Sequence, residues 1–378
     1  MECRLPDCVV VGAGVFGSWA ALRLRESGRS VTLVEAFGSG HAKSSSGGAS
    51  RVIRMGYGAD EIYTRWAMRS LAAWKELFAR ARQPELFQPT GVLWTAAPGH
   101  AYTSASIELL ARLGVKHVPM DTGELRRRYP AMHFDAETMG VLEPESGALL
   151  ANRAVRTVTQ MAIAAGVEVV TARIVPPCEE GPLDAVIAED SRTLSAANFV
   201  FACGPWLPKL FPRAIAGRIQ ARRQPVFYFD SPANDMPVWI DFSDPRGPYT
   251  IPPLAGKGFK LALDERGPEF DPDTGSREVT AVETAAARAL LAERFPSLAA
   301  APLLETEICQ YEDTSTGDFL IDRHPRMSNA WLVGGGSGHG FKHGPAVGEY
   351  LTALLDGAAR EARFSWSSKS TVRQRSVY

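Results

Sequence analysis

A glycine-rich turn between two short apolar runs lies near the start of the chain, and few folds accommodate this arrangement. Residues 8–11 (CVVV) are typical of a buried parallel strand, and GAGVFG at residues 12–17 follows directly. Residues 18–26 have a helical pattern, and residues 31–34 form a second apolar run that ends at Glu35. A GxGxxG turn alone is a weak signal. With a strand before it, a helix after it and an acid about 20 residues further on, it predicts a Rossmann-like βαβ unit that binds a dinucleotide.

Each part of this unit has a physical role toward the nucleotide. Gly12 permits the tight turn, Gly14 lets the backbone approach the pyrophosphate, and Gly17 allows the helix to pack closely on the strand. The helix N-terminus presents N–H groups to the phosphates, and Glu35 can accept the hydroxyls of the adenosine ribose. The residues predicted to line this part of the cofactor are Gly12, Gly14, Val15, Phe16, Gly17, Glu35 and Ala36.

Length, charge and cysteine content narrow the class of protein. The chain has 378 residues, 45% of them hydrophobic, and a formal net charge of −1 from well-mixed charges, which suits two domains or one domain with a large insertion. Nothing favours a nucleic acid or a membrane as partner, because the charge is balanced and no apolar run approaches the roughly 20 residues that span a bilayer. The five cysteines include no CxxC pair and the histidines show no metal-ligand spacing, which predicts neither a disulfide framework nor a metal site. The N-terminus does not resemble a secretory signal, so we expect a cytoplasmic monomer or small homo-oligomer.

Residues 41–54 (HAKSSSGGASRVIR) favour a flavin over a nicotinamide cofactor. The segment is small and polar, and then carries Arg51 and Arg54 on a β-branched run. A nicotinamide dehydrogenase would usually continue into another plain βα unit, whereas a loop of small residues can pack along the ribityl chain and ring of a flavin. The alternative is a solvated surface loop. The residues of this segment predicted at the flavin are Ser44, Ser45, Ser50 and Arg51.

Motifs in the same order extend over nearly the whole chain. They are VVVGAGVFG with Glu35, SRVIR at 50–54 with Tyr57-Gly58, FACGPW at 201–206, GFKL at 258–261, CQY at 309–311, DFLID at 318–322 and GHGFK at 338–342. Together they resemble the flavin-dependent amine oxidases of the D-amino-acid-oxidase superfamily, and most of all the family of monomeric sarcosine oxidase and N-methyltryptophan oxidase. The shared order makes this resemblance more specific than any single motif.

The resemblance implies an α/β (α+β) fold, with a Rossmann-like FAD-binding domain and a discontinuous antiparallel-sheet substrate domain. We expect the FAD-binding domain in residues 1–85, 149–220 and 305–365, and the substrate domain in residues 86–148 and 221–304. Short runs broken by Pro and Gly in residues 222–263 agree with an antiparallel sheet. Single strands are expected at residues 87–95 and 167–175, and helices at residues 61–80, 149–165, 281–294 and 344–355.

The resemblance also implies how the second half of the chain contacts the flavin. In the similar oxidases, a cysteine in a Cys-x-Tyr context bonds through sulfur to the flavin 8-methyl group, so Cys309 is predicted to anchor FAD covalently. The alternative is a small buried side chain. Residues 338–341 precede the last helix, and their N–H groups are expected to stabilise negative charge on the reduced flavin. The remaining predicted cofactor contacts are Val175, Gly204, Trp206, Gly338, His339, Gly340, Phe341 and Lys342.

Lys260 lies within an apolar run, and a lysine there needs a reason because burying its charge is costly. In the resembling enzymes the matching lysine lies over the flavin ring and stabilises the superoxide that forms when reduced flavin meets oxygen. The alternative is an outward-facing lysine on a half-buried strand. Arg51 is expected beside the same ring, where it would hold a water near N5.

Four further residues are predicted to contact the substrate. Arg54 offers a planar fork and Lys342 a point charge for a substrate carboxylate, and the alternative is a surface arginine and a helix-start lysine. Tyr249 and Tyr311 could flank the substrate amine, because aromatic faces stabilise a cationic amine. Ordinary core aromatics are the alternative for this pair.

Two departures from the family pattern concern the substrate. Asp264 stands where the pattern has a histidine four residues after the lysine, and residues 46–50 (SGGAS) replace a histidine pair. We therefore expect an FAD oxidase of a secondary or N-methyl amino acid whose identity the resemblance does not fix. Hydride transfer to flavin N5, hydrolysis of the imine and reduction of O2 to H2O2 would follow. The alternatives are a dehydrogenase of the same fold that uses another acceptor, and a flavoprotein that binds or senses without turnover.

Overall fold

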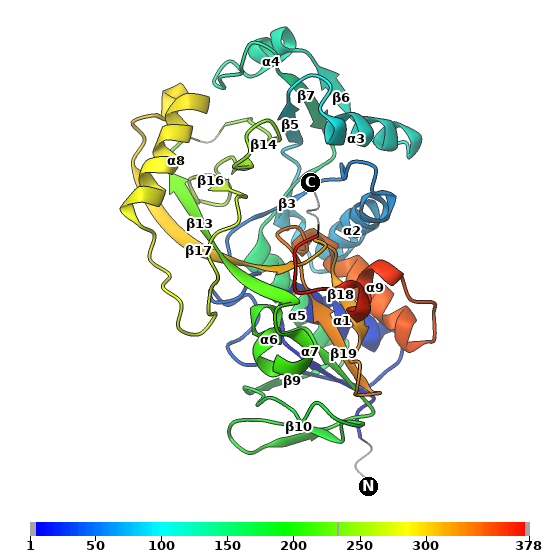
Figure 1. The fold of residues 1–378 in the computed structure, drawn as a ribbon. Helices are drawn as coiled ribbons and strands as arrows, with labels where there is room; N and C mark the ends of the chain where they lie inside the picture. Colours follow the sequence, from blue (N-terminus) through cyan, green and yellow to red (C-terminus); the bar gives the residue numbers. More distant parts are fainter. Residues whose placement is uncertain (1–4, 233, 375–378) are drawn as a thin grey trace.

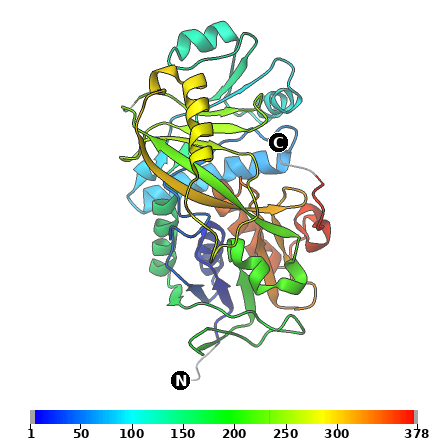
Figure 2. The ribbon, with the colours of Figure 1, turned by 60° about the vertical axis from the view of Figure 1, so that its left-hand side comes forward.

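The computed structural model describes residues 5–232 and 234–374, which form four β-sheets with helices packed against them (Figures 1 and 2). The strands are β1 (Cys8–Val11), β2 (Val31–Glu35), β3 (Arg51–Ile53), β4 (Phe87–Gln88), β5 (Val92–Ala96), β6 (Val118–Met120), β7 (Met139–Glu143), β8 (Gly147–Leu149), β9 (Glu168–Thr171), β10 (Ala185–Ile187), β11 (Thr193–Ser195), β12 (Asn198–Phe201), β13 (Ile219–Phe229), β14 (Val238–Asp241), β15 (Pro248–Ile251), β16 (Phe259–Leu263), β17 (Leu303–Thr314), β18 (Leu320–Arg323) and β19 (Ala330–Gly334).

The helices cover the faces of these sheets. The α-helices are α1 (Val15–Glu26), α2 (Glu61–Arg80), α3 (Ala101–Arg112), α4 (Thr122–Arg128), α5 (Ala151–Ala164), α6 (Leu207–Leu210), α7 (Pro212–Ile215), α8 (Ala281–Arg294) and α9 (Gly344–Leu355). Short 3₁₀ turns occur at η1 (Pro84–Leu86), η2 (Gly204–Trp206), η3 (Pro296–Leu298), η4 (Phe341–His343), η5 (Ala362–Phe364) and η6 (Trp366–Ser368).

A six-stranded sheet in the order β18-β19-β12-β1-β2-β9 carries the N-terminal βαβ unit. All neighbours are parallel except β18 and β19, and β1 lies in the middle. Because side chains alternate across a strand, Cys8 and Val10 face one core, with α1, α2, α5 and α9, while Val9 and Val11 face another, with α6 and α7. Helices therefore cover both faces, as a buried parallel sheet requires.

An eight-stranded sheet in the order β17-β13-β16-β15-β14-β5-β7-β6 forms the second layer. Its neighbours are antiparallel except for β14 and β5. One face packs against α8 through an apolar cluster that includes Phe227, Phe259 and Leu291. The other face carries Tyr228, Ala262 and Cys309, so it is turned away from α8. Figure 1 shows the long pair β13 and β17 running from α8 toward the six-stranded sheet.

The structure confirms the α/β class and several predicted elements. Helices α2, α8 and α9 have the predicted bounds, whereas α1 begins at Val15, directly after the glycine turn, and not at residue 18. One strand over residues 87–95 is wrong: Pro89 has no N–H for a ladder and Gly91 has a φ of +72°, so the chain divides into β4 and β5 in different sheets. The strand predicted over residues 167–175 is shorter and ends at Thr171.

The predicted domain boundaries stay a prediction. Residues 305–314 fall in the segments predicted for the FAD-binding domain, yet they pair in the eight-stranded sheet as part of β17. Within residues 5–232 and 234–374, no helix is long and apolar enough to cross a membrane, and no three His, Cys, Asp or Glu side chains are grouped to hold a metal ion. Four cysteines in this part of the chain are free thiols; Cys3 lies outside the described residues.

Candidate active site

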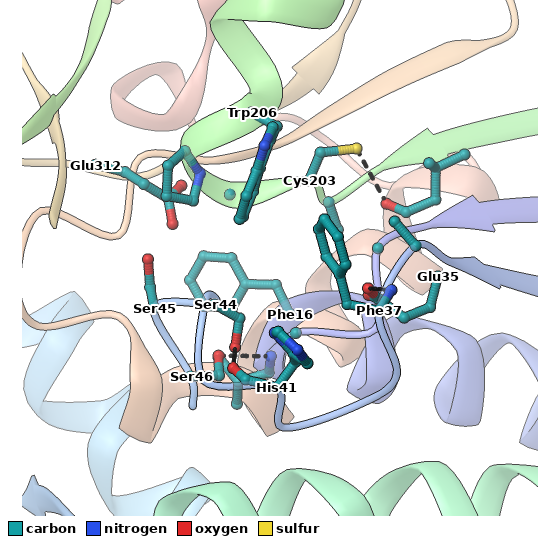
Figure 3. A pocket seen from close by; sticks show the side chains of 18 of the residues that line it. Phe16, Glu35, Phe37, His41, Ser44, Ser45, Ser46, Cys203, Trp206 and Glu312 are labelled. Carbon is teal, nitrogen blue, oxygen red and sulfur yellow. Dashed lines mark hydrogen bonds between the residues drawn. The ribbon is translucent and has the colours of Figure 1, made fainter. Parts of the chain in front are cut away.

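A large pocket of about 1560 Å³, including its open mouth, lies at the carboxyl ends of β1, β2 and β12. Ligands of open α/β sheets bind at this edge, where connections from neighbouring strands diverge. Figure 3 shows Trp206, Cys203 and Glu312 on one side of the pocket and Ser44, Ser45, Ser46 and His41 on the other. The predicted cofactor residues that line it are Gly12, Gly14, Val15, Phe16, Glu35, Ala36, Ser44, Ser45, Arg51, Val175, Gly204, Trp206, Cys309, Gly338, Gly340 and Phe341.

Four predicted cofactor residues are not part of this lining. Gly17 lies under the glycine turn, and Ser50 presents its carbonyl to Arg51 and Lys260. His339 and Lys342 are buried and contact Tyr57 instead. The predicted contacts with the cofactor stay predictions, both for these four residues and for those that line the pocket.

The glycine turn is built by close backbone contacts. Gly12 has a φ of +102°, and a Cβ there would lie 2.5 Å from the carbonyl oxygen of Ala202. A Cβ at Gly17 would lie only 1.8 Å from the carbonyl oxygen of Gly12. Gly14 differs, since a Cβ there would point toward the pocket and meet nothing closer than Ser46 Oγ at 3.6 Å. The outer two glycines are thus required by the fold, and the middle one by access to the pocket.

This difference gives a testable pair of variants. Gly17→Ala should lower the free energy of unfolding by at least about 2 kcal/mol, because the new methyl group overlaps backbone that cannot move without separating α1 from β1. Gly14→Ala should unfold at nearly the same denaturant concentration as the parent protein but bind FAD more weakly. Urea unfolding of the flavin-free proteins and FAD titration measure the two effects separately. Equal stability losses in both variants would contradict this assignment.

Glu35 and Ser46 organise the backbone beside the turn. The Glu35 carboxylate accepts hydrogen bonds from the N–H groups of Ala13 at 2.6 Å and Phe37 at 2.9 Å. Ser46 Oγ accepts from the N–H of Val15 at 3.0 Å, the first residue of α1. Sequence reasoning missed Ser46, because a serine 31 residues away gives no local sign that it caps this helix.

Other lining residues were also missed from the sequence. Phe37 stacks on His41 with ring centres 5.2 Å apart and lies 6.0 Å from Trp206, whose Nε1 donates to Asp273 at 2.8 Å. The position of Phe37, two residues after the predicted Glu35, was the one available sign in the sequence. Glu312 is half-buried at the pocket wall, and desolvation raises the pKa of its carboxyl to about 7 although the Gly335 N–H lowers it.

The chemistry of the lining fits a dinucleotide with polar groups along its length. Ser45 Oγ and Gln310 Oε1 line the pocket, are shielded from solvent and have no hydrogen-bond partner among the described residues. Buried polar atoms in folded proteins are nearly always paired, so each marks a position for a ligand group. FAD carries hydroxyls, phosphates and a polar ring edge that could satisfy such atoms.

Lys260, Arg51 and Cys309 meet at the end of the pocket that the eight-stranded sheet forms. Lys260 projects from β16 on the face away from α8, because its neighbours Phe259 and Leu261 face that helix. Its Nζ donates to the carbonyl of Ser50 at 3.0 Å, and the same carbonyl accepts from Arg51 Nη1 at 2.8 Å. Arg51 Nη2 lies 3.0 Å from Cys309 Sγ.

The environment of Lys260 is dry. The residue is 1% exposed, so the alternative of an outward-facing lysine is wrong. Burial, with the nearby positive charge of Arg51, lowers the pKa of Lys260 to about 7, although Cys309 and Glu307 oppose the shift. A cation that can gain or lose its charge near neutral pH therefore lies close to Arg51 and Cys309, two residues of the pocket lining.

The predicted substrate residues surround a second buried region next to this end. Arg54 is 4% exposed, which excludes a surface arginine, and its guanidinium lies 4.8 Å from the Tyr57 ring centre and 3.4 Å from Tyr102 OH. Lys342 is 5% exposed and is likewise no surface lysine. Sequence reasoning missed Tyr102, which reaches the site from α3 without any motif.

Tyr249, Tyr311 and Asp264 close this region from the eight-stranded sheet. Tyr311 lies two residues after Cys309 on β17 and therefore on the same face, and Tyr249 packs beside Cys309 in one apolar cluster. Burial raises the pKa of Asp264, and Arg266, Tyr311 and Arg54 oppose the shift. Arg266, also missed from the sequence, pairs with Asp264 at 3.2 Å and lies 4.9 Å from the Tyr311 ring.

Comparison with known proteins agrees with this geometry. Monomeric sarcosine oxidase from Bacillus sp. (strain B-0618) is 32% identical over 358 residues, covering 92% of this chain and 91% of that protein. N-methyl-L-tryptophan oxidase from Yersinia pestis (strain Pestoides F) is 24% identical, covering 91% of this chain and 93% of that protein. The crystal structure of L-proline dehydrogenase from P. horikoshii superimposes with a TM-score of 0.82 at 20% identity, covering 96% of this chain and 97% of that one.

A structure of NikD, described as an unusual amino acid oxidase, has a TM-score of 0.79 at 20% identity and covers 96% of this chain and 97% of that one. These two structural similarities show the shared fold. The family model for FAD dependent oxidoreductases (DAO) matches residues 7–354, which include the glycine turn, both sheets and the loop at residues 336–341. The chain therefore belongs to the DAO family of FAD-dependent oxidoreductases, and it is similar in sequence to amine oxidases that act on CH–NH groups.

Proposed function

We propose that this protein is an FAD-dependent oxidase of a secondary or N-methyl amino acid, with FAD attached through Cys309 and oxygen as electron acceptor. The observation that carries this proposal is the burial of three basic side chains, Lys260 next to the pocket and Arg54 and Lys342 in the second buried region. Basic side chains are costly to bury in their charged form without partners, so a site that contains them favours anionic ligands. A substrate carboxylate and the superoxide formed during reoxidation are two such anions.

The residues that line the pocket support one orientation of FAD. The glycine turn and Glu35 would hold the pyrophosphate and the adenosine ribose, and residues 44–46 would follow the ribityl chain. Arg51, Cys309 and Lys260 would then lie at the isoalloxazine ring. Bound FAD supplies the two-electron chemistry, since it accepts hydride from the carbon next to the amine nitrogen and returns the electrons to oxygen.

The second buried region suits an amino acid with its carboxylate inward. Arg54 can make a bidentate contact with a carboxylate, and Lys342 can add a charge-assisted hydrogen bond. Tyr249 and Tyr311 would flank the amine and restrict its orientation. A hydride leaves only from a neutral amine, and the imine product would add water after its release and hydrolyse to a carbonyl compound and an amine.

A panel of N-methyl and cyclic amino acids tests this proposal. At least one member should yield hydrogen peroxide and bleach the flavin absorbance anaerobically, and its methyl ester should react roughly 10–100-fold more slowly in kcat/KM because the charge-assisted bonds are lost. Peroxide is measured with a coupled peroxidase, and bleaching at the flavin absorption band. Bleaching without peroxide would instead indicate a dehydrogenase, and neither signal across the panel would indicate a binding or sensing protein.

A further inference from the structure

A hydrogen-bond network of four buried side chains, Tyr57, His339, Lys342 and His343, adjoins the proposed carboxylate site. Lys342 Nζ donates to Tyr57 OH at 2.8 Å and to the carbonyl of His339 at 3.0 Å. The Tyr57 hydroxyl also lies 3.2 Å from His339 Nδ1 and 2.8 Å from His343 Nε2. None of these four side chains is more than 5% exposed. A tyrosine hydroxyl has one hydrogen and two lone pairs, so three partners fix the direction of each bond.

The direction of these hydrogen bonds follows from His339, which lies at one end of the network. His339 Nε2 lies 3.1 Å from the carbonyl of Gly317, which accepts only, so this nitrogen carries a hydrogen. Burial, the largest cause, holds the pKa of His339 well below its usual value, so the ring is neutral and Nδ1 accepts. Tyr57 therefore donates its hydrogen to His339 Nδ1.

The oxygen of Tyr57 must then accept from both remaining partners. Lys342 Nζ supplies one hydrogen, and His343 Nε2 supplies the other. This leaves His343 Nδ1 without a hydrogen, and that atom has no hydrogen-bond partner among the described residues. The assignment thus uses both lone pairs of the Tyr57 hydroxyl.

The same assignment of hydrogen positions bears on the protonation state of Lys342. A neutral amine has two hydrogens, and the two acceptors around Nζ are Tyr57 OH and the His339 carbonyl. No carboxylate of the described chain lies within 4.0 Å of Nζ. Burial lowers the pKa of Lys342 well below its usual value, Arg54 lowers it further, and Glu143 and Asp264 oppose the shift. Two acceptors and no carboxylate of the described residues next to Nζ are the surroundings of a neutral amine, the state that the hydrogen-bond geometry favours for Lys342 in the ligand-free protein.

Tyr57 also touches the second cation of the site. The Arg54 guanidinium lies 4.8 Å and Lys342 Nζ 5.3 Å from the Tyr57 ring centre. One side chain therefore orients Lys342 through its hydroxyl and supports Arg54 through its ring, where a cation over an aromatic face is stabilised.

We propose that Tyr57 is the positioning residue for the substrate carboxylate, and that binding of the carboxylate is coupled to uptake of one proton from solvent by Lys342. The proposal rests on the proposed carboxylate contact of Arg54 and Lys342. The carboxylate approaches a neutral amine whose two hydrogens already bond to the protein. The proton taken up becomes the third N–H of the ammonium and is directed at the carboxylate, while Tyr57 and His339 keep their bonds. An anion beside Nζ favours the charged amine, so uptake follows binding.

The experiment uses the FAD-loaded protein and acetate, a carboxylate without an amine to oxidise. Calorimetric titration near pH 7.5, run in phosphate and in Tris, gives the number of protons taken up from the difference between the two heats. We expect about one proton for the parent protein and none for Lys342→Met. Tyr57→Phe keeps the ring but loses the acceptor, and it should raise both the acetate Kd and the substrate KM about 10-fold, with kcat changed far less.

Tyr63→Phe is the matched control. Tyr63 lies beside Tyr57, with ring centres 5.3 Å apart, but its hydroxyl bonds to Asp318 and the N–H of Phe319 instead of Lys342. This variant should keep the parent values of Kd, KM and proton uptake. No proton uptake by the parent protein, or equal effects of the two phenylalanine variants, would overturn the inference. Unchanged acetate binding in Lys342→Met would instead contradict the carboxylate contact in the proposed function.

Discussion

Replacing Lys260 with methionine should slow the reoxidation of reduced protein by oxygen by at least about 100-fold, while anaerobic reduction by substrate stays within a few-fold of the parent rate. The side chain is buried, and its Nζ bonds to the Ser50 carbonyl at 3.0 Å. A preorganised cation in a water-excluded site stabilises a developing anion far more than the same cation in water. Methionine has a similar length and no charge, so it removes that stabilisation without leaving a cavity.

Stopped-flow measurement separates the two half-reactions. Substrate is mixed with the oxidised protein anaerobically to follow bleaching, and the reduced protein is then mixed with oxygenated buffer to follow recovery. Lys257→Met is the matched control, since Lys257 lies three residues earlier but is 40% exposed and pairs with Glu305. It should leave both rates unchanged. Equal oxygen reactivity in Lys260→Met and the parent protein would contradict the assignment of Lys260.

The pH profile gives a second measure of the same residue. The pKa of Lys260 is lowered to about 7, chiefly by burial, so its charge is present below that pH and lost as the pH rises through it. The reoxidation rate of the parent protein should therefore fall as the pH is raised from 6 to 9, and the profile of Lys260→Met should be nearly flat.

Replacing Cys309 with alanine should convert a covalently held flavin into one that is released completely on denaturation. Cys309 Sγ lines the pocket and lies 3.0 Å from Arg51 Nη2. Formation of a thioether would remove one hydrogen from the thiol and one from the flavin methyl group, and oxygen would take up the two electrons.

Acid precipitation and mass spectrometry read out this change. The parent pellet should be yellow, and the intact mass should exceed that of the polypeptide by FAD minus two hydrogens. Cys203→Ala is the control, because Cys203 also lines the pocket but donates to the Val11 carbonyl at 3.3 Å. Its pellet should stay yellow. A colourless parent pellet would refute covalent attachment, whereas a yellow Cys309→Ala pellet would place the attachment elsewhere.

Local rules explain which parts of the fold could be predicted. The glycine turn was readable because its strand, glycines, helix and acid follow one another in a single βαβ unit, in which Gly17 packs against the Gly12 carbonyl. Helix α8 has a capping box between Thr280 and Glu283 and stops before Pro296, so both of its ends are marked in the sequence. The prediction of a single strand over residues 87–95 was wrong because hydrophobicity continues across the break. Only the pairing partners show that β4 and β5 belong to different sheets.

The candidate site was predicted less completely, for a different reason. Lys260, Arg54 and Cys309 could be named from motifs, but Tyr57 and Tyr102 acquire their contacts only when segments distant in sequence meet. Tyr57 appeared in a motif without any role. Its partners His339 and His343 lie 282 and 286 residues further along the sequence, and no periodicity connects them with Tyr57.

The position of Cys309 on β17 has a mechanical consequence. The glycine turn belongs to the six-stranded sheet, whereas Cys309 belongs to the eight-stranded sheet. A cofactor gripped by one layer and bonded to the other would act as a strut between them. It would limit the relative motion of the two sheets. Loss of the cofactor would therefore increase this motion as well as remove the redox centre.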